Sequence, residues 1–331
     1  MQAIVQEGYG APEQVLRLGE RDTPTAGPDD VLVRVRATSV NTPDWITVTG
    51  IPYVLRVRSG LRGPRTPVRG TDVAGLVEAV GENVADLEPG DEVFGSAWED
   101  SLATVGTFAE LTVAPAAMLI RKPAGLGFDE AAASVMSGIT ALLAVRDVGE
   151  VGPGTTILVN GASGGVGTFA VQIARALGGE VTGVCGTRNV ELVRSLGATH
   201  VVDYTREDFT EGDRRYDVVL DNVLNHSPAR TRRTVAPGGI LIPNSVGNTG
   251  GMLAGLPKMA RAGLMRKGSI RVKTVSCVVN RENLAALAAL LESGDVRAVI
   301  DEAYPLAEAG KAVAHMAGHH ASGKVVVTVG P

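Results

Sequence analysis

The stretch "TILVNGASGGVGTFAVQIARALGGEVTGVCGTRN", residues Thr156 to Asn189, decides the fold of this chain. It contains an apolar run at Thr156–Asn160, a turn rich in glycine, an apolar helix expected from Gly165, and a second apolar run at Glu180–Cys185. A strand, a glycine turn and a helix together form a phosphate-binding device. The first helical N–H groups lack intrahelical partners, and the helix dipole favours an anion there.

The glycine spacing is a variant of the dinucleotide-binding motif. Gly161, Gly164 and Gly167 lie three residues apart, and a strict G-x-G-x-x-G frame would begin at Ala162. Glycine turns precede many helices, so a tight turn without a ligand is the alternative. The strand before the turn and the strand after the helix favour a dinucleotide. We therefore predict that this turn holds a pyrophosphate.

The end of the second apolar run bears on the choice of cofactor. Enzymes that select NAD usually place an acid near this point, against the ribose 2′-hydroxyl. No acid occurs between Val181 and Val190, and Thr187, Arg188 and Asn189 occur there instead. An acid beside a 2′-phosphate would cost about 4 kcal/mol per charge pair at an effective dielectric of 20, and an arginine reverses the sign. The pattern predicts NADPH over NADH, with a solvated Arg188 as the alternative.

Composition excludes several classes of protein. The chain has 331 residues, enough for two domains, and a net charge of −5, which argues against a general nucleic-acid surface. Its two cysteines, Cys185 and Cys277, form no disulfide framework and fit a reducing compartment. The N-terminus has no signal-peptide pattern. The apolar helix expected at Ala131–Val145 is shorter than the ~20 residues of a membrane span. We expect a cytoplasmic protein without nucleic-acid or membrane partners.

Apolar periodicity divides the chain near Pro123. Before it, alternating or apolar runs predict strands at Val31–Val40, Thr71–Val80, Asp91–Gly95 and Phe108–Val113. After it, strands alternate with helices, which predicts an α/β fold with a doubly wound parallel sheet. The expected strands are Thr156–Asn160, Glu180–Cys185, His200–Asp203, Asp217–Asp221, Ile240–Ile242 and Ser269–Val279, and the expected helices include Asn189–Leu196 and Asn283–Leu291. The tail then reads as strand, helix, strand, and we expect it to return to the first domain.

Several longer motifs resemble the zinc-independent quinone oxidoreductases (zeta-crystallin-like) among the medium-chain dehydrogenases/reductases. They are "VNTPDW" at 40–45, "GTDVAGLVEAVG" at 70–81, "PGDEVFG" at 89–95, "SGITAL" at 137–142, "NGASGGVGTFAVQIA" at 160–174, "SLGATHVVDY" at 195–204, "YDVVLDNV" at 216–223 and "SGKVVV" at 322–327. The resemblance implies a GroES-like catalytic domain at 1–122, completed by 300–331. It also implies a Rossmann NADPH-binding domain at 123–299.

The resemblance also bears on metals. Zinc alcohol dehydrogenases of the same superfamily supply thiolate and imidazole ligands where this chain has Asn41 and Thr71. We therefore expect no catalytic zinc. His315 and His319 have an i, i+4 spacing that could suggest a metal, but surface histidines near a helix end are the simpler interpretation.

The resemblance implies a set of cofactor-binding residues. Ser163, Gly164, Gly165 and Val166 would line the pyrophosphate. Thr187 and Tyr204 would contact the adenosine 2′-phosphate with Arg188, Thr140 would lie near the nicotinamide, and Asn222 near its ribose. Two alternatives stay open: Thr140 could bond its own helix, and Tyr204 could be an ordinary residue at a strand end.

The expected reaction is hydride transfer from NADPH to the β-carbon of an enone or enal, or to a quinone. Negative charge then develops on the carbonyl oxygen, where a hydrogen-bond donor accelerates the step. Asn41 is the first candidate donor, with a turn residue before Pro43 as the alternative. Tyr53 is the second candidate, and Trp45 is expected to shape the pocket.

Other functions and assemblies remain open. An enoyl-thioester reductase would need basic contacts for a carrier group, and only the loop with Arg56, Arg58, Arg62, Arg65 and Arg69 offers them. That loop could equally be a solvated surface. A non-enzymatic, NADPH-binding regulatory or RNA-binding protein is the third possibility. We also expect a homodimer, because the strand at Ser269–Val279 could form an exposed sheet edge that a second copy pairs or covers.

Overall fold

The computed structural model describes residues 1–51, 53, 56–61, 63–98, 106–245, 270–318 and 321–330. Arg62, Ser269 and His319, singled out from the sequence, lie outside the described residues. The chain divides into two compact units. The first contains Met1–Ile139, Val278–Glu292 and Ala298–Pro331, and the second contains Thr140–Cys277 and Ser293–Arg297.

The division falls inside a helix. Helix α4 (Phe128–Leu142) begins in the first unit and ends in the second, where it continues as a π-helical turn at Leu143–Val148. The helix is longer than the expected Ala131–Val145, so the length argument against a membrane span does not hold. The stretch Phe128–Val148 is long and apolar enough to cross a membrane, yet 78% of its apolar window is buried inside the protein. Core helices pass the same test of length and composition, so this helix is weak support for a membrane span.

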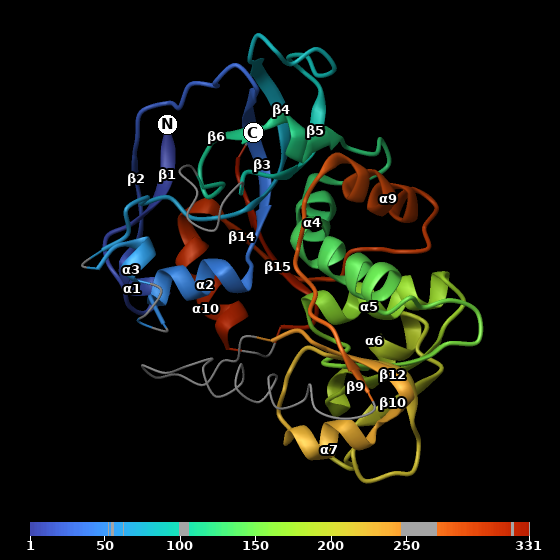
Figure 1. Cartoon of the computed structure of the whole chain (residues 1–331). Helices are drawn as coiled ribbons and strands as arrows, with labels where there is room; N and C mark the ends of the chain where they lie inside the picture. The colour runs from blue at the N-terminus through green and yellow to red at the C-terminus, as the bar shows by residue number, and fades with distance from the viewer. Residues whose placement is uncertain are drawn as a thin grey trace. The chain divides into compact units, whose positions relative to one another are not determined.

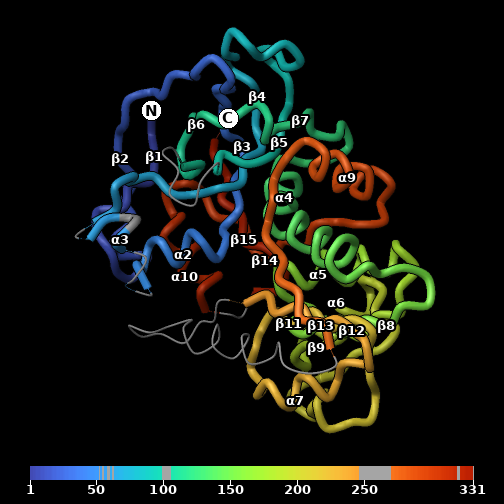
Figure 2. Tube along the Cα trace, viewed as in Figure 1, coloured from blue at the N-terminus to red at the C-terminus, as the bar shows by residue number. Residues whose placement is uncertain are grey.

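The first unit is built on a largely antiparallel sheet (Figure 1). Its strand order is β14 (Ile300–Pro305), β15 (Lys324–Thr328), β3 (Asp30–Ser39), β4 (Asp72–Val80), β5 (Glu92–Ser96) and β7 (Leu119–Arg121), with β6 (Leu111–Pro115) also on β3. A separate hairpin joins β1 (Gln2–Gln6) to β2 (Leu16–Glu20). Figure 2 shows the red C-terminal strand β15 beside the blue strand β3, and the two pair antiparallel with Val326 opposite Ser39.

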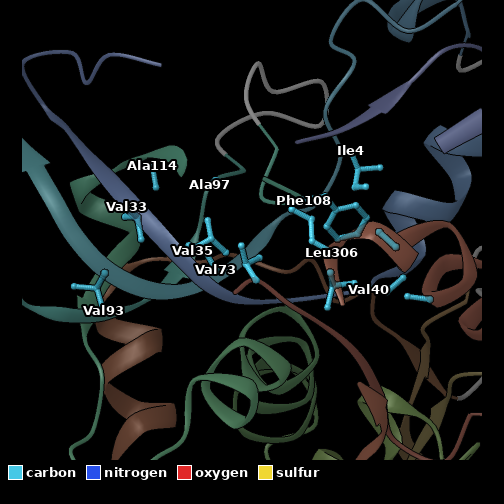
Figure 3. Close-up of a cluster of buried hydrophobic side chains, with 14 of the residues drawn as sticks. Ile4, Val33, Val35, Val40, Val73, Val93, Ala97, Phe108, Ala114 and Leu306 are labelled. Atoms are coloured by element: carbon cyan, nitrogen blue, oxygen red, sulfur yellow. The ribbon is translucent and has the colours of Figure 1, made fainter. Parts of the chain in front are cut away.

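The core of this unit follows from alternation along β3. Val31, Val33 and Val35 are buried, while the residues between them are partly exposed. All three valines belong to one buried cluster with Phe108, from the loop before β6, and Leu306, from the C-terminal segment. Figure 3 shows Val33 and Val35 in this cluster. The first and last parts of the sequence therefore share one hydrophobic core.

Besides the first part of α4, the described residues of the first unit form the helices α1 (Pro12–Val15), α2 (Thr42–Thr49), α3 (Arg56–Ser59), α9 (Arg281–Glu292) and α10 (Ala309–Ala317). Helix α2 begins at a capping box: the Asn41 side chain pairs with the backbone at Asp44, and the Asp44 side chain accepts the Asn41 N–H. It ends at Gly50, whose φ of 63° suits a left-handed cap. The interpretation of Asn41 as a turn residue is thus refined, since it begins a helix.

The second unit contains the predicted parallel sheet. Its strand order is β10 (His200–Asp203), β9 (Glu180–Cys185), β8 (Thr156–Asn160), β11 (Tyr216–Asp221), β12 (Val235–Pro243) and β13 (Arg271–Val272). Every neighbouring pair in that order is parallel. Numbered along the chain this is 3-2-1-4-5-6, the order of a doubly wound dinucleotide-binding sheet. The α/β prediction is confirmed, and β8, β9 and β10 have the expected bounds.

Helices α5 (Gly165–Ala176), α6 (Val190–Ser195) and α7 (Pro228–Arg233) cover this sheet. The sheet buries Leu158, Val184, Val219 and Leu241 from four adjacent strands. The strand expected at Ser269–Val279 is wrong in length, because only Arg271–Val272 pairs, at the end of the strand order. Two residues offer little edge for a second copy, and the homodimer stays a prediction.

Candidate functional site

The glycine turn of the second unit is fixed to the neighbouring strand by its backbone. The N–H groups of Gly161 and Ala162 both donate to the Val184 carbonyl, at 3.1 and 2.9 Å. Gly161 has a φ of 78°, a left-handed conformation that favours glycine. These bonds hold the turn against the end of β9.

Gly167 lets helix α5 approach the turn. A Cβ at Gly167 would lie 2.1 Å from the Gly161 carbonyl oxygen, which is fixed backbone. The first intrahelical bond runs from Thr168 N–H to the Gly164 carbonyl, so the amides of Gly165 and Val166 precede the helical ladder. Helix α5 therefore presents an N-terminus suited to an anion, with Ser163, Gly164, Gly165 and Val166 gathered around it.

We call the polar residues Asn160, Asp221, Asn222 and Asn244 the strand-end cluster. Asn244 follows β12, and the other three lie at the carboxyl ends of β8 and β11. The Asn160 amide donates to Asp221 Oδ1 at 2.8 Å, and the Asn244 amide donates to Asn222 Oδ1 at 2.8 Å. Strands β8 and β11 flank the switch point of the sheet, where ligands of doubly wound folds bind.

The strand-end cluster is incompletely bonded. Asp221 Oδ2 and Asn222 Nδ2 are buried, and neither has a hydrogen-bond partner among the described residues. Leu224 close by has a φ of 54°, which is unusual for a residue with a side chain, and its N–H donates to Asp221 Oδ1. Unpartnered buried polar atoms cost free energy, so this edge fits a polar ligand such as a ribose hydroxyl.

The tips of β9 and β10 place Thr187 next to an acid, Asp203, that lies outside the stretch 181–190. Asp203 lies opposite Cys185 in the parallel ladder, and Thr187 Oγ1 donates to Asp203 Oδ2 at 2.7 Å. The absence of an acid at 181–190 stands, but the neighbouring strand supplies one. Its position at the end of the expected strand His200–Asp203 was the signal available in the sequence.

The other predicted contacts of the adenosine end lie around this acid. Tyr204 is 63% exposed, and its hydroxyl lies beside Gly186, where a Cβ would meet it at 3.0 Å. Arg188 is exposed and lies in the 3-10 turn Thr187–Asn189. Thr140, by contrast, is buried in helix α4.

The first unit contains a second polar site, the Asn41 network, formed by Ser39, Asn41, Asp44, Thr71, Asp72 and Lys324. Asn41 is central: its Nδ2 donates to Asp72 Oδ2 at 2.8 Å and to Thr71 Oγ1 at 3.1 Å. Its Oδ1 accepts from Lys324 Nζ at 2.6 Å. The amide thus sits between a carboxylate and an ammonium group, with its donors and its acceptor both engaged.

Burial dominates the electrostatics of the Asn41 network. Asp44 accepts the Asn41 N–H at 2.8 Å and the Gly70 N–H at 3.0 Å, yet desolvation raises its pKa to about 7. Burial also raises the pKa of Asp72, opposed by Lys324 and by the hydrogen bonds from Ser39 and Asn41. Both carboxyl groups therefore bind protons more tightly than in water.

Tyr53 lies outside this network. Its ring packs on the Arg56 guanidinium, 4.2 Å from the ring centroid, and Tyr9 packs on the same guanidinium at 4.3 Å. Arg56 also donates to the Gly50 and Thr49 carbonyls at the end of α2, at 2.9 and 3.2 Å. The loop arginine is therefore a structural clamp, and the side chain of Tyr53 remains 46% exposed.

The residues at the zinc-ligand positions are Asn41 and Thr71, which contact each other through an amide and a hydroxyl. Within the described part of the chain, no group of three His, Cys, Asp or Glu residues could hold a metal ion. His315 contacts Asp301 at 3.0 Å, Glu302 at 3.3 Å and the Tyr304 hydroxyl at 3.0 Å. These contacts hold His315, a residue of α10, against β14.

Comparison with known proteins identifies the class. Residues 27–124 match the alcohol dehydrogenase GroES-like domain, and residues 196–327 match the zinc-binding dehydrogenase domain. The chain is 33% identical to a quinone oxidoreductase of Pseudomonas aeruginosa, over 96% of this chain and 97% of that protein. It is 34% identical to the trans-enoyl reductase pgmF of Aspergillus terreus, over 92% and 87%.

A solved structure of a quinone oxidoreductase has the same fold. The Escherichia coli quinone oxidoreductase complexed with NADPH superposes with a TM-score of 0.79 and 26% identity, covering 99% of this chain and all of that one. The chain belongs to the quinone oxidoreductase family of the medium-chain dehydrogenases/reductases. The predicted combination of a GroES-like domain and a Rossmann domain is confirmed.

Proposed function

We propose that this protein is an NADPH-dependent reductase of quinones or α,β-unsaturated carbonyls that works without zinc. The observation that carries the cofactor proposal is the strand-end cluster, with two buried polar atoms unpartnered among the described residues, on the same sheet as the glycine turn. The NADPH bound to the E. coli relative supports the same choice.

The chain's own residues would each hold one part of the cofactor. The amides of Gly165 and Val166 would bind the pyrophosphate at the start of α5. Asn222 would offer its buried Nδ2 to the nicotinamide ribose, and Arg188 would offer charge to the 2′-phosphate. When bound, the nicotinamide supplies the hydride.

The two catalytic candidates differ in what they can offer a substrate oxygen. Asn41 would have to release Asp72 or Thr71 before its amide could donate to a carbonyl. Tyr53 keeps an exposed phenol on a ring held by Arg56. We propose Tyr53 as the donor to the reacting oxygen and Asn41 as the residue that orders the start of α2.

Titration of the purified protein with NADPH and NADH by calorimetry, followed by turnover of NADPH with 1,4-benzoquinone and with an enal, tests the proposal. Tighter binding of NADPH and oxidation by either acceptor is the expected result. Binding without turnover of any acceptor would favour a regulatory, non-enzymatic role, and preference for NADH would contradict the cofactor proposal.

An enoyl-thioester reductase is the second candidate, favoured by the 34% identity to the trans-enoyl reductase. Crotonyl-pantetheine, a short thioester with a carrier-like arm, separates the two. Turnover of the thioester at least tenfold faster than of a matched enal, lost when Arg65 is replaced by alanine, would favour the second candidate. Equal rates would favour the quinone or enone reductase.

A further inference from the structure

Asp203 lies where the proposed 2′-phosphate site needs positive charge. It ends strand β10, opposite Cys185 at the end of β9. Thr187 contacts it from the tip of β9, and Tyr204 follows it in sequence. It is 8% exposed. Its carboxylate accepts from Thr187 Oγ1 at 2.7 Å, from Thr205 Oγ1 at 2.8 Å and from Thr205 N–H at 3.0 Å.

These bonds decide which way the hydroxyl protons point. Each threonine hydroxyl has one proton. Thr187 gives its proton to Asp203 Oδ2, and Thr205 gives its proton to Asp203 Oδ1 or to Thr187 Oγ1, which lies 2.8 Å away. In either case the Thr187 proton points inward, and the hydroxyl offers only lone pairs to a ligand. Lone pairs suit a ribose 2′-hydroxyl, which can donate, and oppose a phosphate, which only accepts.

Asp203 also keeps its charge at neutral pH. The hydrogen bond from Thr187 and those from Thr205 hold its pKa below the usual range for an aspartate. The Arg206 guanidinium lies 3.5 Å from Asp203 Oδ2, but its side chain is 77% exposed, so water screens its charge. Any 2′-phosphate held by Thr187 would therefore face a buried negative charge one side chain away.

We propose that Asp203 is a specificity-determining residue that limits the preference of this protein for NADPH and keeps NADH as a usable cofactor. The proposal rests on the proposed function, since it concerns the same dinucleotide site. Arg188 favours the 2′-phosphate and Asp203 opposes it, so the ratio of the two affinities reflects their balance. A negative charge one side chain away from the 2′-phosphate, partly screened by water, changes the affinity for NADPH by about tenfold.

The chain provides a matched control for Asp203. Asp203–Tyr204–Thr205 and Asp208–Phe209–Thr210 form the same turn, because the carboxylate of each aspartate accepts the N–H and the hydroxyl of the threonine two residues on. The Arg230 guanidinium donates to both Asp208 and Glu211. Thr187, a residue of the predicted ligand site, contacts the turn that begins at Asp203. Loss of charge at Asp208 therefore tests the turn without the predicted ligand site.

The experiment measures the dissociation constants of NADPH and NADH by calorimetry for the wild-type protein, Asp203→Asn and Asp208→Asn. We expect the NADPH-to-NADH affinity ratio to rise about tenfold in Asp203→Asn and to stay within twofold of wild type in Asp208→Asn. Asp203→Ser removes the charge with a smaller side chain and replaces Asp203→Asn if that variant does not fold.

The opposite results are distinct. A ratio that stays within twofold in a folded neutral variant that still binds both cofactors overturns the role of Asp203, as does an equal change in Asp208→Asn. A wild-type protein that binds neither cofactor overturns the proposed function first, and the role of Asp203 with it.

Discussion

The Asn41 network and the strand-end cluster are both polar and rich in asparagine and aspartate, but they differ in how far their hydrogen bonds are satisfied. In the Asn41 network, none of the side-chain atoms is left buried and unpartnered within the described chain. In the strand-end cluster, Asp221 Oδ2 and Asn222 Nδ2 are buried and have no hydrogen-bond partner among the described residues. The hydrogen bonds of the Asn41 network are satisfied within the protein, whereas those of the strand-end cluster require a ligand.

This difference separates a structural role from a binding role. A satisfied buried network holds its elements in one arrangement, and breaking it leaves a buried charge. A buried polar atom without a hydrogen-bond partner raises the free energy of the protein, and a ligand that bonds to this atom removes that cost. We therefore expect changes in the Asn41 network to affect unfolding, and changes at the glycine turn and its neighbours to affect cofactor affinity.

The largest expected effect is the loss of Lys324. Lys324→Met removes the buried ammonium that bonds Asn41 Oδ1 at 2.6 Å and the Val40 carbonyl at 2.9 Å, and leaves Asp72 uncompensated. We expect the free energy of unfolding of the first unit to fall by about 3–5 kcal/mol. Both tryptophans, Trp45 and Trp98, lie in this unit, so their fluorescence during urea denaturation reports its unfolding.

Lys311→Met is the matched control, because Lys311 is exposed and pairs with Glu308 on the surface. It should change stability by less than about 0.5 kcal/mol. Equal effects of the two variants would contradict a structural role for the network.

The glycine turn should respond through binding. Gly167→Ala places a Cβ against the Gly161 carbonyl and displaces α5 from the turn. Dinucleotide affinity should fall by about a hundredfold or more, since the amides at the start of α5 no longer point at the pyrophosphate. Gly152→Ala, where a Cβ meets nothing within 4 Å, is the control for unit stability. Retained affinity in Gly167→Ala would place the cofactor elsewhere.

The pH dependence of stability should sharpen the contrast. The pKa of Asp44 rises to about 7 in the folded protein, above its value in the unfolded chain, so the folded state binds this proton more tightly. Its contribution is greatest below the unfolded pKa and is lost as pH rises through the folded pKa. Between pH 5 and 7 the free energy of unfolding should fall by about 2 kcal/mol from this group.

Asp44→Asn removes the titrating group and should flatten that part of the profile recorded by tryptophan fluorescence. The baseline stability of the variant will be lower, because the Asn41 and Gly70 N–H groups bond different oxygens of Asp44 and the amide nitrogen that replaces one oxygen cannot accept a hydrogen bond. A profile as steep as that of the wild type would exclude Asp44 as its source.

The smallest effect concerns selectivity. Arg188→Ala should weaken NADPH binding about tenfold and leave NADH binding unchanged, because only NADPH carries the 2′-phosphate. Arg194→Ala, on the exposed face of α6 where Arg194 pairs with Glu191, should change neither. Parallel losses of both cofactors in Arg188→Ala would assign that arginine to the fold of the 3-10 turn.

Much of the second unit was predictable because its strands are continuous apolar runs separated by glycine. The runs at Thr156–Asn160 and Glu180–Cys185 match β8 and β9. The first unit was less accessible. Helix α2 was missed, since its short sequence around Pro43 reads as a turn until Asn41 and Asp44 are seen to cap it. The expected strand at Phe108–Val113 begins later, at Leu111.

The candidate site shows a sharper limit. The glycine turn is a local pattern, and sequence spacing alone locates it. Asp203 and Thr187 lie sixteen positions apart and meet only because β9 and β10 pair in parallel register. The Asn41 network joins residues nearly three hundred positions apart through Lys324. Patterns in a short stretch of sequence therefore reveal neither Asp203 as the partner of Thr187 nor Lys324 as the partner of Asn41.

The position of β15 has a consequence for how the protein is made. Residues 324–328 lie inside the sheet, between β14 and β3, so the first unit cannot close its sheet until that stretch has left the ribosome. The second unit, which ends at Arg297, is encoded entirely before it and can fold while synthesis continues. Until Lys324 arrives, the nascent chain holds Asn41 and Asp72 without their cation. The unit that begins the polypeptide is thus the one that matures last.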